Sequence, residues 1–84
     1  MYVSVAYRRP DLDTEGELAF TPRSYTYNTE LPLAVGDMVI APTRYGEQPA
    51  IVRAIDLAAP DFECKEITVR LPEVMQHAHL PADG

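Results

Sequence analysis

The feature that most restricts the fold is the even spacing of proline along the chain. About one residue in ten is proline, at positions 10, 22, 32, 42, 49, 60, 72 and 81. Proline has no backbone N–H and its ring clashes with the preceding helical turn, so it is excluded from helix interiors. The spacing therefore predicts short strands between the prolines and no long helix before Pro72.

The predicted strands are segments whose side chains alternate with a period of two residues, or which are apolar throughout. Tyr25 and Tyr27, for example, share one face of their segment. The strands predicted in this way cover residues 1–8, 24–29, 37–41, 50–55 and 63–71. In the last of them, we expect inward side chains at Ile67, Val69 and Leu71, and outward ones at Glu66, Thr68 and Arg70.

A β-hairpin from Leu33 to Asp56 is the most clearly predicted unit. Gly36 supplies the positive φ that a turn needs before one strand, and Gly46 lies at the tip of the connection TRYGEQ. Short antiparallel strands must curl or close to protect their edges. We therefore predict a mainly β fold, a small antiparallel SH3-like barrel or curled sheet of about four or five strands. Pro72 suits the start of a short C-terminal helix over Glu73–Leu80.

The length of 84 residues predicts one small domain over residues 1–80 and a flexible tail over 81–84. A core of this size is marginal, so a partner, or a second copy in a homodimer, can complete it. No apolar run reaches the length of a membrane span, and the N-terminus lacks the pattern of a secretory signal. With Cys64 as the single cysteine, these features predict a cytoplasmic protein.

The charge of the chain points to a basic partner. Seven basic residues face thirteen acidic ones, which gives a net charge of −6. Because phosphate neutralisation needs clustered Lys and Arg, this balance disfavours direct DNA binding and anionic membranes. The predicted partner-binding residues are the acids of one loop and of the segment near the last strand: Asp11, Asp13, Glu15, Glu17, Asp61, Glu63 and Glu66.

Neither a metal site nor a catalytic site is predicted. The acidic loop begins like a calcium-binding EF-hand loop, but Pro22 stands where the bidentate Glu is required. His77 and His79 lack the paired ligands of structural zinc sites. The sequence also has no glycine-rich phosphate loop and no nucleophile motif. We therefore expect no cofactor, no metal and no enzymatic activity.

An alternative ligand site rests on tyrosine and arginine. Aromatic side chains on the face of a small barrel can stack on single-stranded bases. The candidate ligand-binding residues are Arg23, Tyr25, Tyr27, Arg44 and Tyr45. The competing interpretation is that these tyrosines close the core with their hydroxyl groups at its edge.

The stretch from Tyr25 to Asp56, YTYNTELPLAVGDMVIAPTRYGEQPAIVRAID, carries a resemblance. It resembles the element Y-x-Y…L-x-V-G-D-x-V-x-x-P…G-x-x-x-A-x-V in the N-terminal DNA-binding domain of the primosomal replication-restart helicase. It is also similar to short phage and prophage proteins that carry the same stretch. The resemblance covers 32 of the 84 residues and implies a small β domain of phage origin.

In size and acidity, the chain also resembles anti-CRISPR proteins. That likeness implies a phage-encoded anti-defence inhibitor. Such a protein would present a DNA-mimicking acidic surface to a basic nucleic-acid-binding host complex, such as a CRISPR surveillance complex, and block DNA recruitment. Two alternatives stay open: a binding module for single-stranded nucleic acid or a nucleotide, and a structural or assembly protein of a phage particle.

Overall fold

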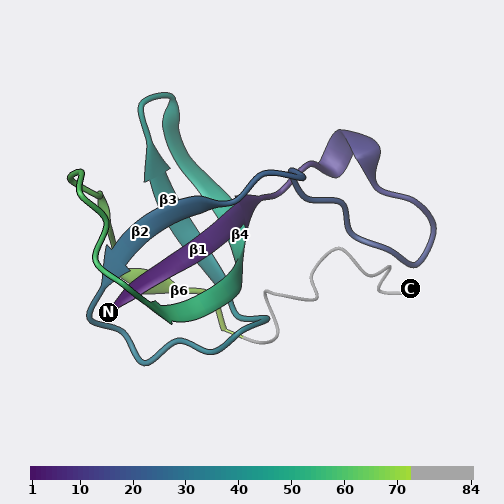
Figure 1. The fold of residues 1–84 in the computed structure, drawn as a ribbon. Helices are drawn as coiled ribbons and strands as arrows, with labels where there is room; N and C mark the ends of the chain where they lie inside the picture. The colour runs from purple at the N-terminus through teal and green to yellow at the C-terminus, as the bar shows by residue number, and fades with distance from the viewer. Residues whose placement is uncertain (73–84) are drawn as a thin grey trace.

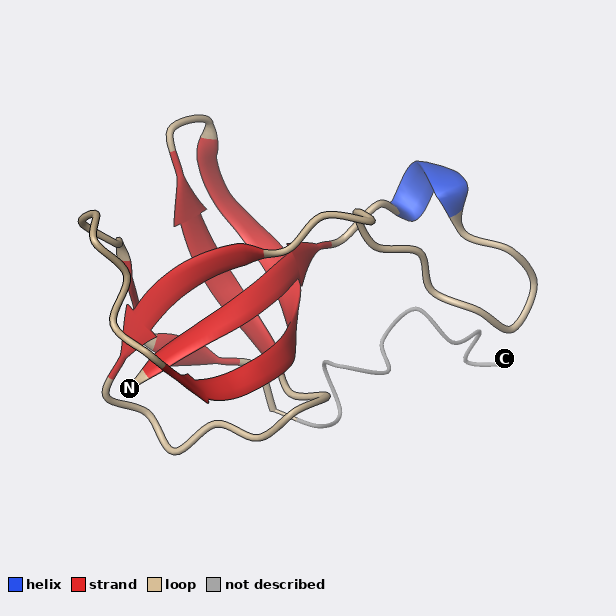
Figure 2. Cartoon of the chain, viewed as in Figure 1, coloured by secondary structure: helices blue, strands red, loops and turns tan. Residues whose placement is uncertain are grey.

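The computed structural model describes residues 1–72, whose strands form one six-stranded sheet that curls into a nearly closed barrel (Figures 1 and 2). The predicted mainly β fold is thereby confirmed. In the sheet, the strands follow the order β5-β2-β1-β4-β3-β6. The elements along the chain are β1 (Tyr2–Tyr7), the 3-10 turn η1 (Pro10–Leu12), β2 (Tyr25–Thr29), β3 (Met38–Thr43), β4 (Gly46–Leu57), β5 (Glu66–Ile67) and β6 (Val69–Arg70).

The core lies inside the barrel, where the inward side chains of neighbouring strands meet. Val5 of β1 stands opposite Val52 of β4, and Val39 of β3 stands opposite Ala50 of β4. All four are at most 1% exposed. Small and β-branched side chains of this kind fill the narrow interior of a small barrel and favour extended backbone.

The segment from Glu66 to Arg70 closes the barrel by changing its partner strand. β5 pairs in parallel with β2, whereas β6 pairs antiparallel with β3. The prediction of one alternating strand over residues 63–71 is therefore wrong. Ile67 is fully buried but Val69 is 45% exposed, because a segment that leaves one sheet edge for the other cannot keep a single face inward. The parallel pair also makes the sheet mixed.

The β3–β4 hairpin forms as predicted, and its strands continue through two prolines where the sequence prediction ended them. Thr43 pairs with Gly46, which leaves a two-residue loop at the tip. The Arg8 N–H donates to the Pro49 carbonyl at 2.9 Å, so the polar backbone edge of Pro49 faces β1. The N–H that Pro49 lacks therefore removes no hydrogen bond from the hairpin.

The turn before β3 accounts for the sequence Val35-Gly36-Asp37. Gly36 has a φ of +99°, a conformation that side-chain-bearing residues rarely adopt. The Asp37 carboxylate accepts the Ala34 N–H at 2.9 Å and the Arg70 Nε–H at 3.1 Å. This part of the stretch that carries the resemblance thus builds a turn and fastens β6 to β3.

The predicted helix over Glu73–Leu80 and the tail over 81–84 lie outside the described residues. Within residues 1–72, the helical structure consists of η1, which has three residues. No helix in this part of the chain has the length and apolarity that a membrane crossing requires.

Candidate functional site

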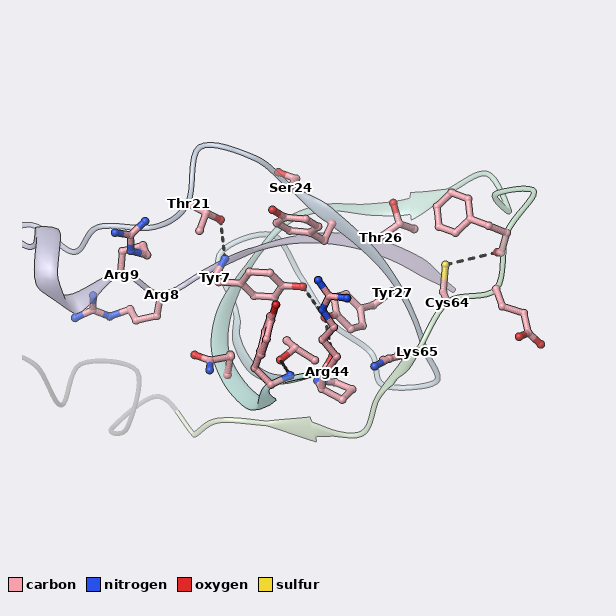
Figure 3. A pocket seen from close by; sticks show the side chains of 17 residues that line it. Tyr7, Arg8, Arg9, Thr21, Ser24, Thr26, Tyr27, Arg44, Cys64 and Lys65 are labelled. Atoms are coloured by element: carbon pink, nitrogen blue, oxygen red, sulfur yellow. Dashed lines mark hydrogen bonds between the residues drawn. The ribbon is translucent and has the colours of Figure 1, made fainter.

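A groove of about 810 Å³ opens at one end of the barrel, where the closing segment does not reach (Figure 3). β5 and β6 join β2 and β3 only at Asn28–Thr29 and Val39–Ile40. At the opposite ends of these strands, Tyr25 of β2 and Thr43 of β3 line the opening. We call this space the mouth groove; it is bounded by the end of β1, the start of β2, the hairpin tip and residues 62–65.

Three tyrosines form the floor of the mouth groove because strand alternation directs them inward. Tyr7 follows Val3 and Val5 on the inner face of β1, and Tyr25 stands opposite Val5. The rings of Tyr7 and Tyr25 stack with centroids 4.7 Å apart and an angle of 19° between their planes. Tyr27 below them is buried, whereas Tyr25 stays 37% exposed and offers aromatic surface to the groove.

A chain of hydrogen bonds holds the floor across the opening. The Tyr27 hydroxyl donates to the Pro42 carbonyl at 2.7 Å. Because a phenol has one proton, the Tyr7 hydroxyl must be the donor in its 2.7 Å bond with the Tyr27 oxygen. Burial, together with the bond to Tyr7, raises the pKa of Tyr27 well above its usual range. These two bonds tie the paired strands β1 and β2 to β3, which is a neighbour of neither in the sheet.

The mouth groove concentrates the positive charge of an otherwise acidic chain. Four bases, Arg8, Arg9, Arg44 and Lys65, and one acid, Glu63, line it, for a formal charge of +3. The remaining three bases and twelve acids of the sequence carry −9, which restores the total of −6. Asp13 and Asp11, which pair with Arg8 and Arg9, are among those twelve acids, so the positive field at the opening comes mainly from Arg44 and Lys65.

The four cations differ in their interaction partners within the chain. Arg8 and Arg9 pair with carboxylates of the acidic loop, as described below. The Arg44 guanidinium lies over the Tyr45 ring, 5.1 Å from its centroid. Among residues 1–72, neither Arg44 nor Lys65 has a carboxylate partner, so both charges are available to an anion.

The acidic loop is tied down by the arginines at the end of β1. Arg8 Nη2 lies 2.6 Å from Asp13 Oδ2, and the other oxygen of Asp13 accepts the Ala19 N–H at 2.7 Å. Arg9 Nη2 lies 2.9 Å from Asp11 Oδ2, and this hydrogen bond lowers the pKa of Asp11. These carboxylates therefore serve local pairs within the chain.

The other predicted partner-binding acids are exposed and fall into two groups, one in the loop and one near β5. Glu15 and Glu17 lie in the loop that projects from the barrel beside η1, to the right in Figure 1. The segment with Asp61 and Glu63 lies at the opposite end of the molecule (Figure 1), and Glu66 follows it in β5. The structure thus places the two acidic groups apart.

The alternative set of predicted residues is largely brought together. Tyr25, Tyr27, Arg44 and Tyr45 all line the mouth groove, whereas Arg23 does not. Sequence reasoning missed the remaining aromatic and basic lining residues, Tyr7, Arg8, Arg9, Phe62 and Lys65. Tyr7 could have been predicted from the strand alternation, which places it on the same inward face as Val3 and Val5. The position of residues 62–65 could not, because it depends on how the barrel closes.

No metal site appears within residues 1–72, where no three His, Cys, Asp or Glu side chains are grouped as metal ligands would be. His77 and His79, weighed above as zinc ligands, lie outside these residues. Comparisons of the chain with protein-family models, curated proteins and solved structures found no match.

Proposed function

We propose that this protein binds single-stranded nucleic acid or a nucleotide in the mouth groove. The observation that carries the proposal is the stacked pair Tyr7–Tyr25, flanked by Arg44 and Lys65, two cations without carboxylate partners in the described chain. Stacking surfaces beside unpaired positive charge are the two parts that proteins use to bind unpaired bases and their phosphates. The groove volume of about 810 Å³ lies in the usual range for ligand sites.

The acidic exterior supports a single strand over a duplex. A duplex presents two charged backbones and would bring phosphates close to the rest of the chain, whose formal net charge outside the groove is −9. A single strand is narrow enough to lie along the positive opening. The bases of a single strand are also free to stack on tyrosine.

The test is a fluorescence-anisotropy titration with labelled dT12 at 50 mM salt. We expect Tyr45→Ala, at a ring that is 81% exposed, to weaken binding roughly 5- to 100-fold without unfolding the chain. Arg44→Ala should also weaken it. Arg23→Ala is the matched control, since Arg23 is exposed and does not line the groove. No binding of dT12 by the unaltered chain would overturn the proposal.

A second candidate is the inhibitor of a host nucleic-acid-handling complex, with a CRISPR surveillance complex as one such partner. It is favoured by the exposed acids Glu15 and Glu17, on a loop that projects from the barrel beside η1 (Figure 1). In this proposal, a phage-encoded protein acts by protein contact in the host cytoplasm and has no enzymatic activity. The acids would occupy positions that phosphates take in the partner.

The two candidates are separated by reversing the loop charge. Glu15→Lys with Glu17→Lys should abolish inhibition of such a complex while thermal stability stays nearly unchanged, because both side chains are exposed. The same double variant should bind dT12 at least as tightly as the unaltered chain. Inhibition that survives both charge reversals at low salt would dismiss the acidic-loop mechanism.

A further inference from the structure

Three of the four cations of the mouth groove stand at its two ends, with Arg44 and the tyrosine floor between them (Figure 3). In Figure 3, Arg8 and Arg9 lie at one end, Lys65 lies toward the other, and Tyr7 and Tyr27 lie between. A ligand that uses both ends must therefore carry negative charge on both sides of a flat, stackable group.

The strand register gives the separation of these ends. The Asn28 N–H donates to the Lys65 carbonyl at 3.0 Å, and Asn28 pairs with Tyr2 of β1, so the Lys65 backbone is level with Tyr2. Arg8 follows Tyr2 by six residues along the same strand direction. At about 3.3 Å per residue, the two backbone positions are roughly 20 Å apart.

One nucleotide cannot bridge this separation, whereas a short oligonucleotide can. A helically stacked strand advances about 3.4 Å per nucleotide, so roughly 20 Å corresponds to at most about six nucleotides. An extended strand, or a Lys65 side chain that reaches toward the mouth, lowers the number. Phosphates repeat along the strand, which supplies the negative charge that both ends require.

The pair between Arg9 and Asp11 does not prevent this use of the groove. Arg9 and Asp11 have side chains that are 43% and 61% exposed, so water already competes for their ion pair. A phosphate can take the place of the carboxylate at the same guanidinium. Arg8, by contrast, is 13% exposed and is held by Asp13, and we assign it to the structure of the loop.

We infer that the ligand of the mouth groove is a single-stranded oligonucleotide of about three to six nucleotides that runs across it from Arg9 to Lys65. This inference rests on the proposed function. Phosphates near the two termini of the oligonucleotide contact the two ends, and a base between them stacks at Tyr25. A free nucleotide reaches one end only and binds more weakly.

The experiment is a competition series at 50 mM salt, in which unlabelled dTMP and dT2, dT3, dT6 and dT12 displace labelled dT12. We expect the concentration for half displacement to fall steeply from dTMP to dT6 and then to level off. If dTMP competes within a few-fold of dT6, the oligonucleotide inference is wrong while the proposed nucleotide site stands. If labelled dT12 does not bind at all, both fail. Displacement by an acidic peptide of similar charge, but not by dT6, would assign the groove to a protein segment and overturn both.

Salt dependence tests the two ends separately. Each phosphate contact on a single strand contributes about 0.7 to the slope of log K against log salt. Lys65→Ala and Arg9→Ala should each lower that slope by about this amount for dT6, and both side chains are exposed enough for the variants to fold. Arg23→Ala should leave the slope unchanged. If neither Lys65→Ala nor Arg9→Ala changes the salt slope, the proposed path of the strand is contradicted.

Discussion

Tyr27 links the stability of the barrel to the shape of its mouth. Its ring belongs to the core, while its hydroxyl joins Tyr7 to the Pro42 carbonyl. Both neighbours line the groove, so one buried hydroxyl sets the position of the floor. A ligand that stacks at Tyr25 thus meets a surface whose geometry is fixed before binding, which lowers the entropic cost of association.

Removal of this hydroxyl should be measurable in the stability of the chain. Tyr27→Phe leaves the Pro42 carbonyl and the Tyr7 hydroxyl without their partner, and we expect a loss of roughly 1–2 kcal/mol in the free energy of unfolding. Denaturant unfolding at pH 7 measures it. Tyr2→Phe is the control, since no hydrogen bond joins the Tyr2 hydroxyl to another of residues 1–72. An equal loss in both variants would contradict the role assigned to Tyr27.

The raised pKa of Tyr27 also fixes the direction in which the free energy of unfolding changes with pH. The pKa of Tyr27 is raised above its ordinary value of 10.0, so the folded chain holds this proton more tightly than the unfolded chain does. Its contribution to stability is present in full below about pH 10 and is lost as the pH rises above that value. The free energy of unfolding should therefore fall above pH 10, and the fall should be smaller in Tyr27→Phe.

At the scale of elements, the turn before β3 and strand β6 are joined through one carboxylate. The hydrogen bond from Arg70, followed by the one from the Ala34 N–H, lowers the pKa of Asp37. Because β6 has two residues, its own backbone bonds to β3 are few, and the Asp37–Arg70 pair adds to them.

Asp37→Ala should loosen this closure. We expect a loss of roughly 1–2 kcal/mol at pH 7, because three hydrogen bonds to the charged carboxylate disappear. The contribution of Asp37 is present above its unfolded pKa, near 3.8, and is lost as the pH falls through the lower folded value. The difference between the variant and the unaltered chain should thus shrink in acid. Asp61→Ala, at an exposed aspartate, is the matched control.

A comparison of the elements with the sequence shows how much of the fold and of the site could be predicted. The first four strands and both turn glycines were predictable because alternation, apolar runs and glycine act locally. The split between β5 and β6 was not, since the alternation from Glu66 to Arg70 does not reveal which strand each residue joins. For the same reason, Lys65 was not assigned to the site, whereas Tyr25 and Arg44 were.

For the whole molecule, the separation of charge is the property with the widest consequence. The mouth groove carries +3 and the rest of the sequence −9. We expect dT12 to bind more tightly than a 12-base-pair duplex at equal salt, because the second backbone must approach acidic surface. Anisotropy with matched labels measures the difference. A duplex that binds as well as the single strand would contradict this account of the charge.

The Val35-Gly36-Asp37 turn limits what can be concluded when another small barrel has a similar sequence at this position. Its glycine is required by the backbone conformation, its aspartate accepts hydrogen bonds from Ala34 in the same turn and from Arg70 of β6, and neither residue lines the groove. Two proteins that share this stretch, by common descent or by convergence, therefore share the structural requirements of the turn. Ligand preference can diverge independently at the mouth, so two chains that share the turn need not share a ligand.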